Sequence, residues 1–312
     1  MYKTSQNWLA YVSPDYTTQI KEIESKKEDE NRVMAIPVSH GCFPAYSFLY
    51  YGDDLTIFYS GDFRFEPLTN LVPQLDEILR ELGIDGVDIA LVEGTNFSAD
   101  YAPITTTMFR EHLSLILREK ELVSVSIDPL DLETFLTTLE LSLLLGRDLV
   151  IGSERLLWMI DEIEQLKPEA LDKIYISEEL QVPTPLPTKN VSLVNDVFKN
   201  PENYVVLIEP VGLLQILRKL KIWGESLNLT GSVVVLTDPE PKESIKEVEE
   251  RALRAWLRGF GIQTFRLRLS GHYLPHQFSQ IINALKPKRL IPIHTEETEL
   301  IIRLFQKFTR RK

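Results

Sequence analysis

The chain has 312 residues, of which 44% are hydrophobic, and this predicts a globular protein with one large domain or two ordinary ones. Its formal net charge of −12 argues against broad, nonspecific adhesion to nucleic acid, because such binding draws most of its free energy from clustered Lys and Arg. A single cysteine, Cys42, excludes a disulfide framework and a cysteine-clustered zinc site, so any metal must be held by histidine and carboxylate.

The first part of the chain predicts a charged lead-in followed by strands. Residues 1–8 lack the pattern of a secretory signal, and no run of about eighteen apolar residues occurs, so we expect a cytoplasmic protein outside membranes. Residues 14–32 are strongly charged without an apolar stripe, which is typical of a helix end that runs into an exposed loop. Branched and aromatic residues then predict a strand at 33–38 and a hairpin formed by 45–51 and 55–59.

Beyond these strands, helices and apolar strands alternate. Helical spacing predicts a helix at 75–82 that stops at Gly83, before a short apolar strand at 87–92. The alternation then continues, and it is typical of a parallel sheet covered by helices. Three prolines at 183–187 mark an irregular crossing or a surface loop. The later helices are expected at 104–120, 132–145, 213–222, 244–258, 275–285 and the carboxyl end, and the strands at 123–127, 148–151, 204–208, 233–236, 263–269 and 290–293.

Five polar side chains of the metal-binding or acid/base type stand just after predicted strands. In layered α/β proteins, loops at strand ends bring such groups together. Each one alone has an ordinary explanation, since a strand-end histidine is usually satisfied by a backbone carbonyl and Asp is a common turn former. Three of the chain's five histidines at such places nevertheless indicate a site, whereas the other two, His112 and His276, fall on predicted helices. The five candidate site residues are His40, Asp62, Glu93, His272 and His294.

The segments around these residues, taken in order, resemble the second part of the metallo-β-lactamase fold, in the β-CASP branch that includes ribonuclease J and the mRNA 3′-end-processing endonucleases. The matching segments are Val38 to Tyr46, Ser60-Gly61-Asp62-Phe63-Arg64, Val92 to Asn96, Ser270-Gly271-His272 and Pro292 to Glu296. The resemblance implies an α/β chain with a partial αββα fold. Residues 1–97 and 244–312 would form the metallo-β-lactamase part, and 98–243 an inserted parallel α/β domain that closes over the active site as a lid.

The resemblance also implies roles for the candidate residues. His40 and His294 would bind zinc, and Asp62 would bridge two zinc ions and take part in catalysis. Glu93 and His272 would form a proton-handling pair, in which a protonated His272 gives a proton to the leaving oxygen. Imidazole and carboxylate are the ligands expected for zinc in the absence of thiolates, and two bridged ions can generate hydroxide near neutral pH. The expected cofactor is therefore zinc, two ions in this family.

One motif of the family is missing. No histidine precedes His40, so the ligand-rich His-x-His-x-Asp-His motif is absent. We expect that the chain begins just past this motif, as the product of a truncated, split or misannotated gene, and that three ligands remain of about seven. Half a β-sandwich would leave an apolar sheet face uncovered, which predicts a partner polypeptide that supplies the other half, a homo-oligomer, or poor solubility.

Two functions follow as hypotheses. The first is a zinc-dependent ribonuclease that hydrolyses RNA phosphodiesters once the missing part is supplied, and retention of all five candidate residues favours it. The second is a non-catalytic scaffold subunit of an RNA-processing complex, or an inactive truncated product, which loss of the first motif favours. Acidic residues in 126–131 argue against recognition of a 5′ phosphate there. Candidates for a narrow basic channel are Arg218, Lys219 and Lys221, then Lys286, Lys288 and Arg289, then Arg310, Arg311 and Lys312.

Overall fold

The computed structural model describes residues 33–98, 103–180, 190–192, 194–222, 229–238 and 243–310. The charged stretch expected at 14–32 and the proline segment at 183–187 lie outside the described residues. The chain divides into two compact units, of which one takes the described residues up to Thr106 and those from Ser270 onward, and the other is Thr107–Leu269. Both units combine helices with a sheet, so the predicted α/β class is confirmed.

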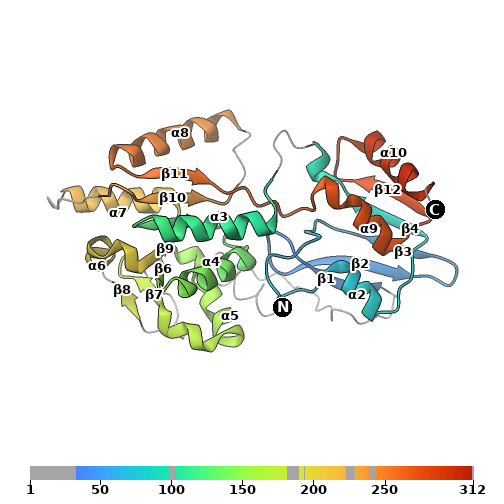
Figure 1. Ribbon diagram of the computed structural model, residues 1–312, viewed down its shortest axis with the longest axis horizontal. Coiled ribbons are helices and arrows are strands. Elements are labelled where there is room, and N and C mark those ends of the chain that lie inside the picture. The colour runs from blue at the N-terminus through green and yellow to red at the C-terminus, as the bar shows by residue number, and fades with distance from the viewer. Residues whose placement is uncertain are drawn as a thin grey trace, which may run out of the picture. The chain divides into compact units, whose positions relative to one another are not determined.

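The first unit is built on a five-stranded mixed sheet in the order β1-β2-β3-β4-β12 (Figure 1). The first three strands pair antiparallel, as the predicted hairpin requires, whereas β4 and β12 add in parallel. The carboxyl ends of β1, β3, β4 and β12 therefore share one edge of the sheet. The strands are β1 (Val33–Val38), β2 (Ala45–Tyr51), β3 (Thr56–Tyr59), β4 (Ile89–Glu93) and β12 (Arg289–Ile293).

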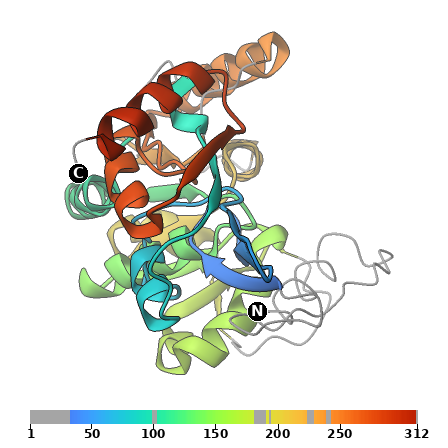
Figure 2. The ribbon, with the colours of Figure 1, turned by 90° about the vertical axis from the view of Figure 1, so that its right-hand side faces the viewer.

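One face of this sheet carries the core of the first unit. Leu49, Phe58 and Ala90 are fully buried on this face. They share it because they are neighbours across three strands and alternate residues of a strand point to the same side. Three helices cover this face: α2 (Leu75–Glu81), α9 (Phe278–Leu285) and α10 (Thr298–Thr309). Figure 2 shows α9 and α10 beside β12. Two short 3-10 helices, Thr95–Ser98 and Pro275–Gln277, complete the described elements.

The opposite face of the same sheet is also apolar. Phe48, Tyr59 and Leu91 are neighbours across three strands and all point to this side. The side chains of Tyr50 and Tyr59 are 39% and 44% exposed. An antiparallel sheet with one solvated face normally alternates apolar and polar residues. Among the described residues, this face therefore carries exposed apolar side chains at Tyr50 and Tyr59, whereas Ala35, which pairs with Phe48, is 1% exposed, and the need for a covering partner stays a prediction.

The second unit is built on a seven-stranded parallel sheet in the order β11-β10-β5-β9-β6-β7-β8. Its central strands are buried on both sides, which explains their continuous apolar sequence. The strands are β5 (Val123–Ser126), β6 (Asp148–Ile151), β7 (Ile174–Ser177), β8 (Val191–Ser192), β9 (Tyr204–Leu207), β10 (Val233–Leu236) and β11 (Gln263–Arg266). The helices are α3 (Thr106–Glu119), α4 (Leu132–Leu144), α5 (Trp158–Leu166), α6 (Val194–Lys199), α7 (Pro210–Ile222) and α8 (Ser244–Gly259), with 3-10 turns at Glu154–Leu156, Pro168–Lys173 and Pro201–Asn203.

The bounds of the two compact units differ from the predicted domain bounds. The inserted domain was expected to span 98–243, but the second unit is Thr107–Leu269. The reason is that β11 pairs in parallel with β10, which places α8 and β11 in the seven-stranded sheet unit. The first unit resumes only at Ser270. In addition, α5, β7, β8 and α6 were not predicted at all.

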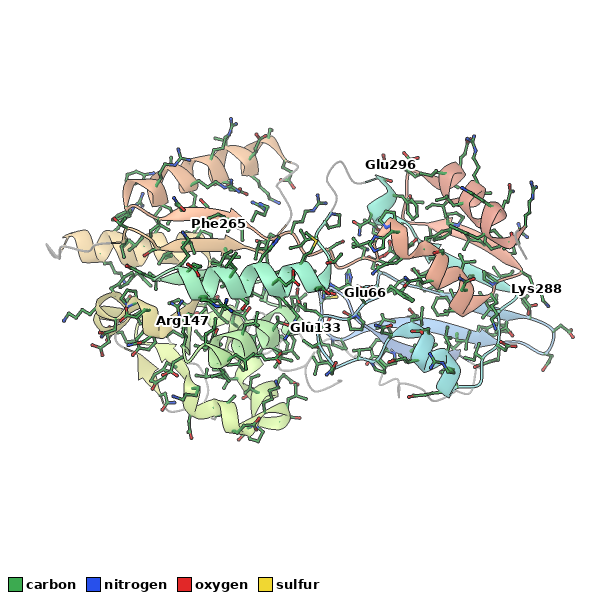
Figure 3. The ribbon with its side chains drawn as sticks, viewed as in Figure 1. Glu66, Glu133, Arg147, Phe265, Lys288 and Glu296 are labelled. Atoms are coloured by element: carbon green, nitrogen blue, oxygen red, sulfur yellow. The ribbon has the colours of Figure 1, made fainter. Side chains whose placement is uncertain are left out.

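A buried guanidinium ties several segments of the second unit together. Arg147, which follows α4, is 4% exposed (Figure 3). Burial lowers its pKa to about 10. It donates hydrogen bonds to the carbonyl oxygens of Leu117, Lys120, Glu121, Pro201 and Tyr204. Arg147 thereby joins the carboxyl end of α3 to the segment that leads into β9, which makes it a structural residue of the unit.

Candidate functional site

All five candidate residues belong to the first unit. His40 follows β1, Asp62 follows β3, Glu93 is the last residue of β4, and His294 follows β12, so these four lie along the shared sheet edge. His272 was expected to follow a strand ending at 269, but β11 ends at Arg266 in the other unit. His272 instead lies in the loop before α9.

Three of the five residues can reach a common ion. One nitrogen of His40, one of His272 and a carboxylate oxygen of Asp62 all lie within 4.8 Å of one another. The imidazole rings of His40 and His272 meet edge to face with centroids 5.1 Å apart, and those of His272 and His294 are 5.9 Å apart. The structure thus brings the predicted histidines together, but it groups His272, not His294, with His40 and Asp62.

A hydrogen bond to the loop that carries His272 fixes the ring of His40. Its Nδ1 lies 2.6 Å from the carbonyl oxygen of Gly271, which can only accept, so Nδ1 carries the proton and Nε2 keeps its lone pair. Burial lowers the pKa of His40 despite the bond to Gly271, and the nearby His272 and Arg64 lower it further. His40 is therefore held as a neutral imidazole with a free Nε2, the form that binds metals.

His272 is paired with a buried carboxylate. Its Nδ1 lies 3.1 Å from Oε1 of Glu93, whose side chain is 1% exposed. The other oxygen, Oε2, accepts a hydrogen bond of 2.8 Å from the backbone N–H of Thr95. The hydroxyl of Tyr273 donates to the backbone carbonyl of Glu93 at 2.6 Å, and burial raises the pKa of that hydroxyl. Both carboxylate oxygens are thus occupied, and the imidazole is fixed with Nε2 pointing away from Glu93.

Two polar side chains that sequence reasoning left without a role hold the 270–273 loop. Asn96 donates through Nδ2 to Oγ of Ser270 at 2.9 Å and to the carbonyl of Tyr273 at 2.9 Å. Arg64 is 5% exposed and donates from Nε to the carbonyl of Ser270 at 2.7 Å and from Nη1 to that of His40 at 3.1 Å. Both stand inside the motifs that carry the resemblance, and their position there was the only available signal.

Asp62 and His294 form a second, more exposed pair. Nδ1 of His294 lies 3.0 Å from Oδ1 of Asp62 and 3.2 Å from Oγ1 of Thr95. The side chains of His294 and Asp62 are 60% and 37% exposed. His294 has φ +48°, a left-handed conformation that is strained for a residue other than glycine and that concentrates at functional sites. Gly61 (φ +55°) makes the turn before Asp62, where a Cβ would lie 2.8 Å from the carbonyl of Tyr46.

The candidate basic channel is not supported by the described side chains. Arg218 stacks on the ring of Trp256 at 4.5 Å, and Lys219 is paired with Glu179. Lys286 is paired with Asp85, and Lys288 (Figure 3) lies 2.7 Å from Asp88. The side chains of Lys221, Arg311 and Lys312 lie outside the described part. Three of the nine candidate cations, Lys219, Lys286 and Lys288, are therefore paired with a carboxylate of their own surroundings.

The acidic segment 126–131 has local structural roles. Asp131 caps α4 by accepting from the N–H of Thr134 at 3.0 Å. Asp128 accepts from the N–H of Leu130 at 2.8 Å. Both are ordinary cap and turn contacts. In the described residues, no helix is both long enough and apolar enough to cross a membrane.

Comparison with known proteins places the fold but not the activity. No family model and no curated protein matches the chain. Among solved structures, the chain is similar to a protein of unknown function from Enterococcus faecalis V583, with a TM-score of 0.70 and 19% sequence identity. The match covers 95% of this chain and 69% of the other. The two proteins therefore share a fold.

Proposed function

We propose that this chain is a metal-dependent hydrolase that cleaves phosphodiester bonds of RNA. The observation that carries the proposal is the cluster of His40, Asp62 and His272, with ligand-capable atoms within 4.8 Å of one another at one edge of a sheet. Here two imidazoles are fixed through Nδ1 by buried acceptors, which leaves both Nε2 atoms available.

The donor atoms suit zinc. Two imidazole nitrogens and a carboxylate oxygen match the three-ligand sets of catalytic zinc sites, which keep one position open. The hydrogen-bond acceptors at Nδ1 of the two imidazoles also suit a metal site, because metal-binding histidines almost always donate their other N–H to a carboxylate or a carbonyl. Bound zinc would polarise a phosphoryl oxygen and neutralise the negative charge that builds up during cleavage.

The chain's own residues would supply proton transfer and orientation. In both His272 and His294, Nδ1 lies within hydrogen-bond distance of a carboxylate oxygen. Nε2 of each ring can therefore hold a proton or present a lone pair. One of them would therefore complete the metal site, and the other would remain for hydrogen bonding or proton transfer near the substrate. Asn96 and Arg64 would keep the 270–273 loop at the correct distance from His40.

The substrate class rests on the order of the sequence motifs. The segments around His40, Asp62, Glu93, His272 and His294 follow the β-CASP order, and that branch acts on nucleic acid. We infer that the first unit is part of a metallo-β-lactamase-like fold, which its mixed sheet with helices on one face supports. RNA is the substrate proposed because the resemblance is to RNA-processing members.

The test is zinc-dependent cleavage of an end-labelled single-stranded RNA by the purified full-length chain. Asp62→Asn removes the negative charge of the cluster while keeping the side-chain size, so we expect cleavage to fall by about 10² to 10⁴-fold. His276→Ala is the matched control, because His276 is exposed in the turn before α9, outside the three-residue metal group. That variant should cleave like the unchanged chain.

Two results would count against the proposal. Zinc-dependent cleavage that Asp62→Asn leaves intact would place the chemistry elsewhere. A folded chain that neither binds zinc nor cleaves RNA would favour the scaffold hypothesis. Thermal unfolding of each variant, measured in parallel, separates loss of chemistry from loss of fold.

A further inference from the structure

We infer that a second copy of this chain binds to the second unit through the outer face of α8 and the neighbouring part of α7, with the two α8 helices antiparallel. The inference goes beyond the proposed function and does not depend on it, because it requires neither metal nor substrate. The surface of α8 that carries it, called the α8 face below, consists of Ile245, Val248, Ala252, Ala255 and Trp256.

The α8 face is an exposed apolar stripe. Each member after Ile245 follows another at a step of three or four residues, so all of them lie on one side of the helix. Ile245, Val248 and Trp256 are 70%, 55% and 54% exposed. The helix already packs on the core of the second unit with a different side, through Leu253 and Leu257. The stripe is therefore a second apolar side, a feature typical of interaction surfaces.

In the described part of the second unit, no helix or strand covers this stripe. Figure 1 shows α8 at the outer side of the unit, next to β11 at the end of its sheet. A partner molecule can therefore reach the α8 face without any rearrangement of the described helices and strands.

The apolar surface continues from α8 onto α7. The guanidinium of Arg218 stacks on the ring of Trp256 at 4.5 Å, which holds the ring in place while it stays exposed. Val211 precedes Arg218 by two turns on the same side of α7, and it is 56% exposed. The outer faces of two neighbouring helices of this length cover about 500 Å² per partner. That area is at the low end for specific interfaces, so we expect a reversible dimer.

The charges of α8 indicate which partner fits. Residues 243–250 include four glutamates and one lysine, whereas 251–258 include three arginines and no acid. Ion pairs within the helix, such as that of Arg251 with Glu247, leave the net charge of each half unchanged. Nucleic acid or an anionic membrane would be repelled by the acidic half. A second α8 in antiparallel orientation instead sets each acidic half against a basic half.

The side-chain sizes along α8 agree with the same orientation. The large residues Ile245 and Val248 lie in the amino half, whereas Ala255 and Gly259 follow in the carboxyl half. An added Cβ at Gly259 would meet nothing within 4 Å, so the surface there has room. Trp256 lies to the side of this row, toward Arg218 of α7. An antiparallel two-fold arrangement therefore sets the large residues of one copy against the small residues of the other.

The test measures self-association of the full-length chain by sedimentation velocity, without metal or RNA. Between about 1 and 200 µM, we expect the weight-average mass to rise from that of the monomer toward that of the dimer. Val248→Glu places a charge within the α8 face, so association should weaken by more than about 10-fold. Leu115→Glu is the matched control and should associate like the unchanged chain, because Leu115 on α3 is 53% exposed, compared with 55% for Val248.

A cysteine experiment tests the orientation of the two helices. In a chain that carries Cys42→Ser, the variant Ala252→Cys should form a disulfide-linked dimer under mild oxidation, because the middle of α8 lies at the two-fold axis. Ile245→Cys should not, since an antiparallel arrangement separates it from its counterpart by about 20 Å, which is too far for a disulfide.

Three results would overturn the inference. The first is a folded chain that stays monomeric up to about 200 µM. The second is association that Leu115→Glu weakens and Val248→Glu leaves intact, which would place the contact elsewhere. The third is crosslinking through Ile245→Cys but not through Ala252→Cys, which would indicate parallel helices. Each variant should melt like the unchanged chain, because the substituted side chains lie on the surface or are small. RNA cleavage tests the proposed function separately, so either proposal can fail while the other stands.

Discussion

Gly271 lies where the first unit has no room for a side chain, and replacing it with alanine is a direct test of the site's packing. A Cβ at this position would lie 2.6 Å from Nδ1 of His40 and 2.9 Å from the backbone nitrogen of Gly41, whereas ordinary contacts begin near 3.4 Å. His40 would have to retreat by about 0.8 Å, the difference between those distances, which a close-packed interior resists. The backbone nitrogen of Gly41 cannot swing aside as a side chain would.

The cost can be estimated from two contributions. Forced overpacking costs about 1–3 kcal/mol, and loss of the hydrogen bond from His40 to Gly271 costs about 1 kcal/mol more. We therefore expect Gly271→Ala to lower the free energy of unfolding by about 2–4 kcal/mol, measured by urea denaturation without added metal. Gly259→Ala is the control, since a Cβ there meets nothing within 4 Å. A Gly271→Ala variant within about 0.5 kcal/mol of the unchanged chain would refute the close contact.

Three further predictions concern stability. Arg147→Met should destabilise the second unit by about 3 kcal/mol or more in thermal unfolding, because buried carbonyls lose their donor, whereas Arg80→Met, at an exposed ion pair, should change little. Burial and the neighbouring glutamates of α5 raise the pKa of Asp161 above its ordinary 3.8, so the folded state binds this proton more readily and stability falls as pH rises through that window. Asp161→Asn should therefore raise the melting temperature at neutral pH and flatten its dependence on acidification. Phe58→Ala should cost about 3–5 kcal/mol and Tyr59→Ala much less in urea denaturation, because they occupy opposite faces of β3; equal losses would contradict the strand's orientation.

The sequence predicted most of the first unit because its signals are local. The strands expected at 33–38 and 45–51 have those bounds in the structure, and the helix expected at 75–82 ends one residue earlier. The region 152–203 escaped prediction for the opposite reason. Its described elements are short, since β7 has four residues, β8 has two and α6 has six, and segments of this length carry little periodic signal.

The domain boundary could not be read from the sequence for a different reason. A helix at 244–259 and a strand at 263–266 look the same whichever sheet they join. Only the long-range pairing of β11 with β10 assigns them to the second unit. Sheet membership of this kind depends on contacts between distant segments, and local periodicity does not report those contacts.

The sequence predicted which residues come together at the candidate site, but it did not predict the residues that hold them in place. The strand-end rule correctly gathered His40, Asp62, Glu93 and His294 at one sheet edge, because a parallel arrangement puts those ends together. Their chemical roles remain predictions. Arg64 was missed because a buried guanidinium that binds carbonyl oxygens has no spacing pattern of its own.

The first unit is discontinuous in sequence, and this has a consequence for how the protein is made. Its sheet gains β12, and its core gains α9 and α10, only from residues after Ser270. During synthesis the second unit has its full sequence when residue 269 emerges, while the first still lacks β12, one of the two strands that pair with β4. Because domains generally fold as units, the second unit can complete before the first. The candidate site is therefore among the last features to form, and a released chain truncated after residue 269 should contain a folded second unit without the pair formed by Glu93 and His272.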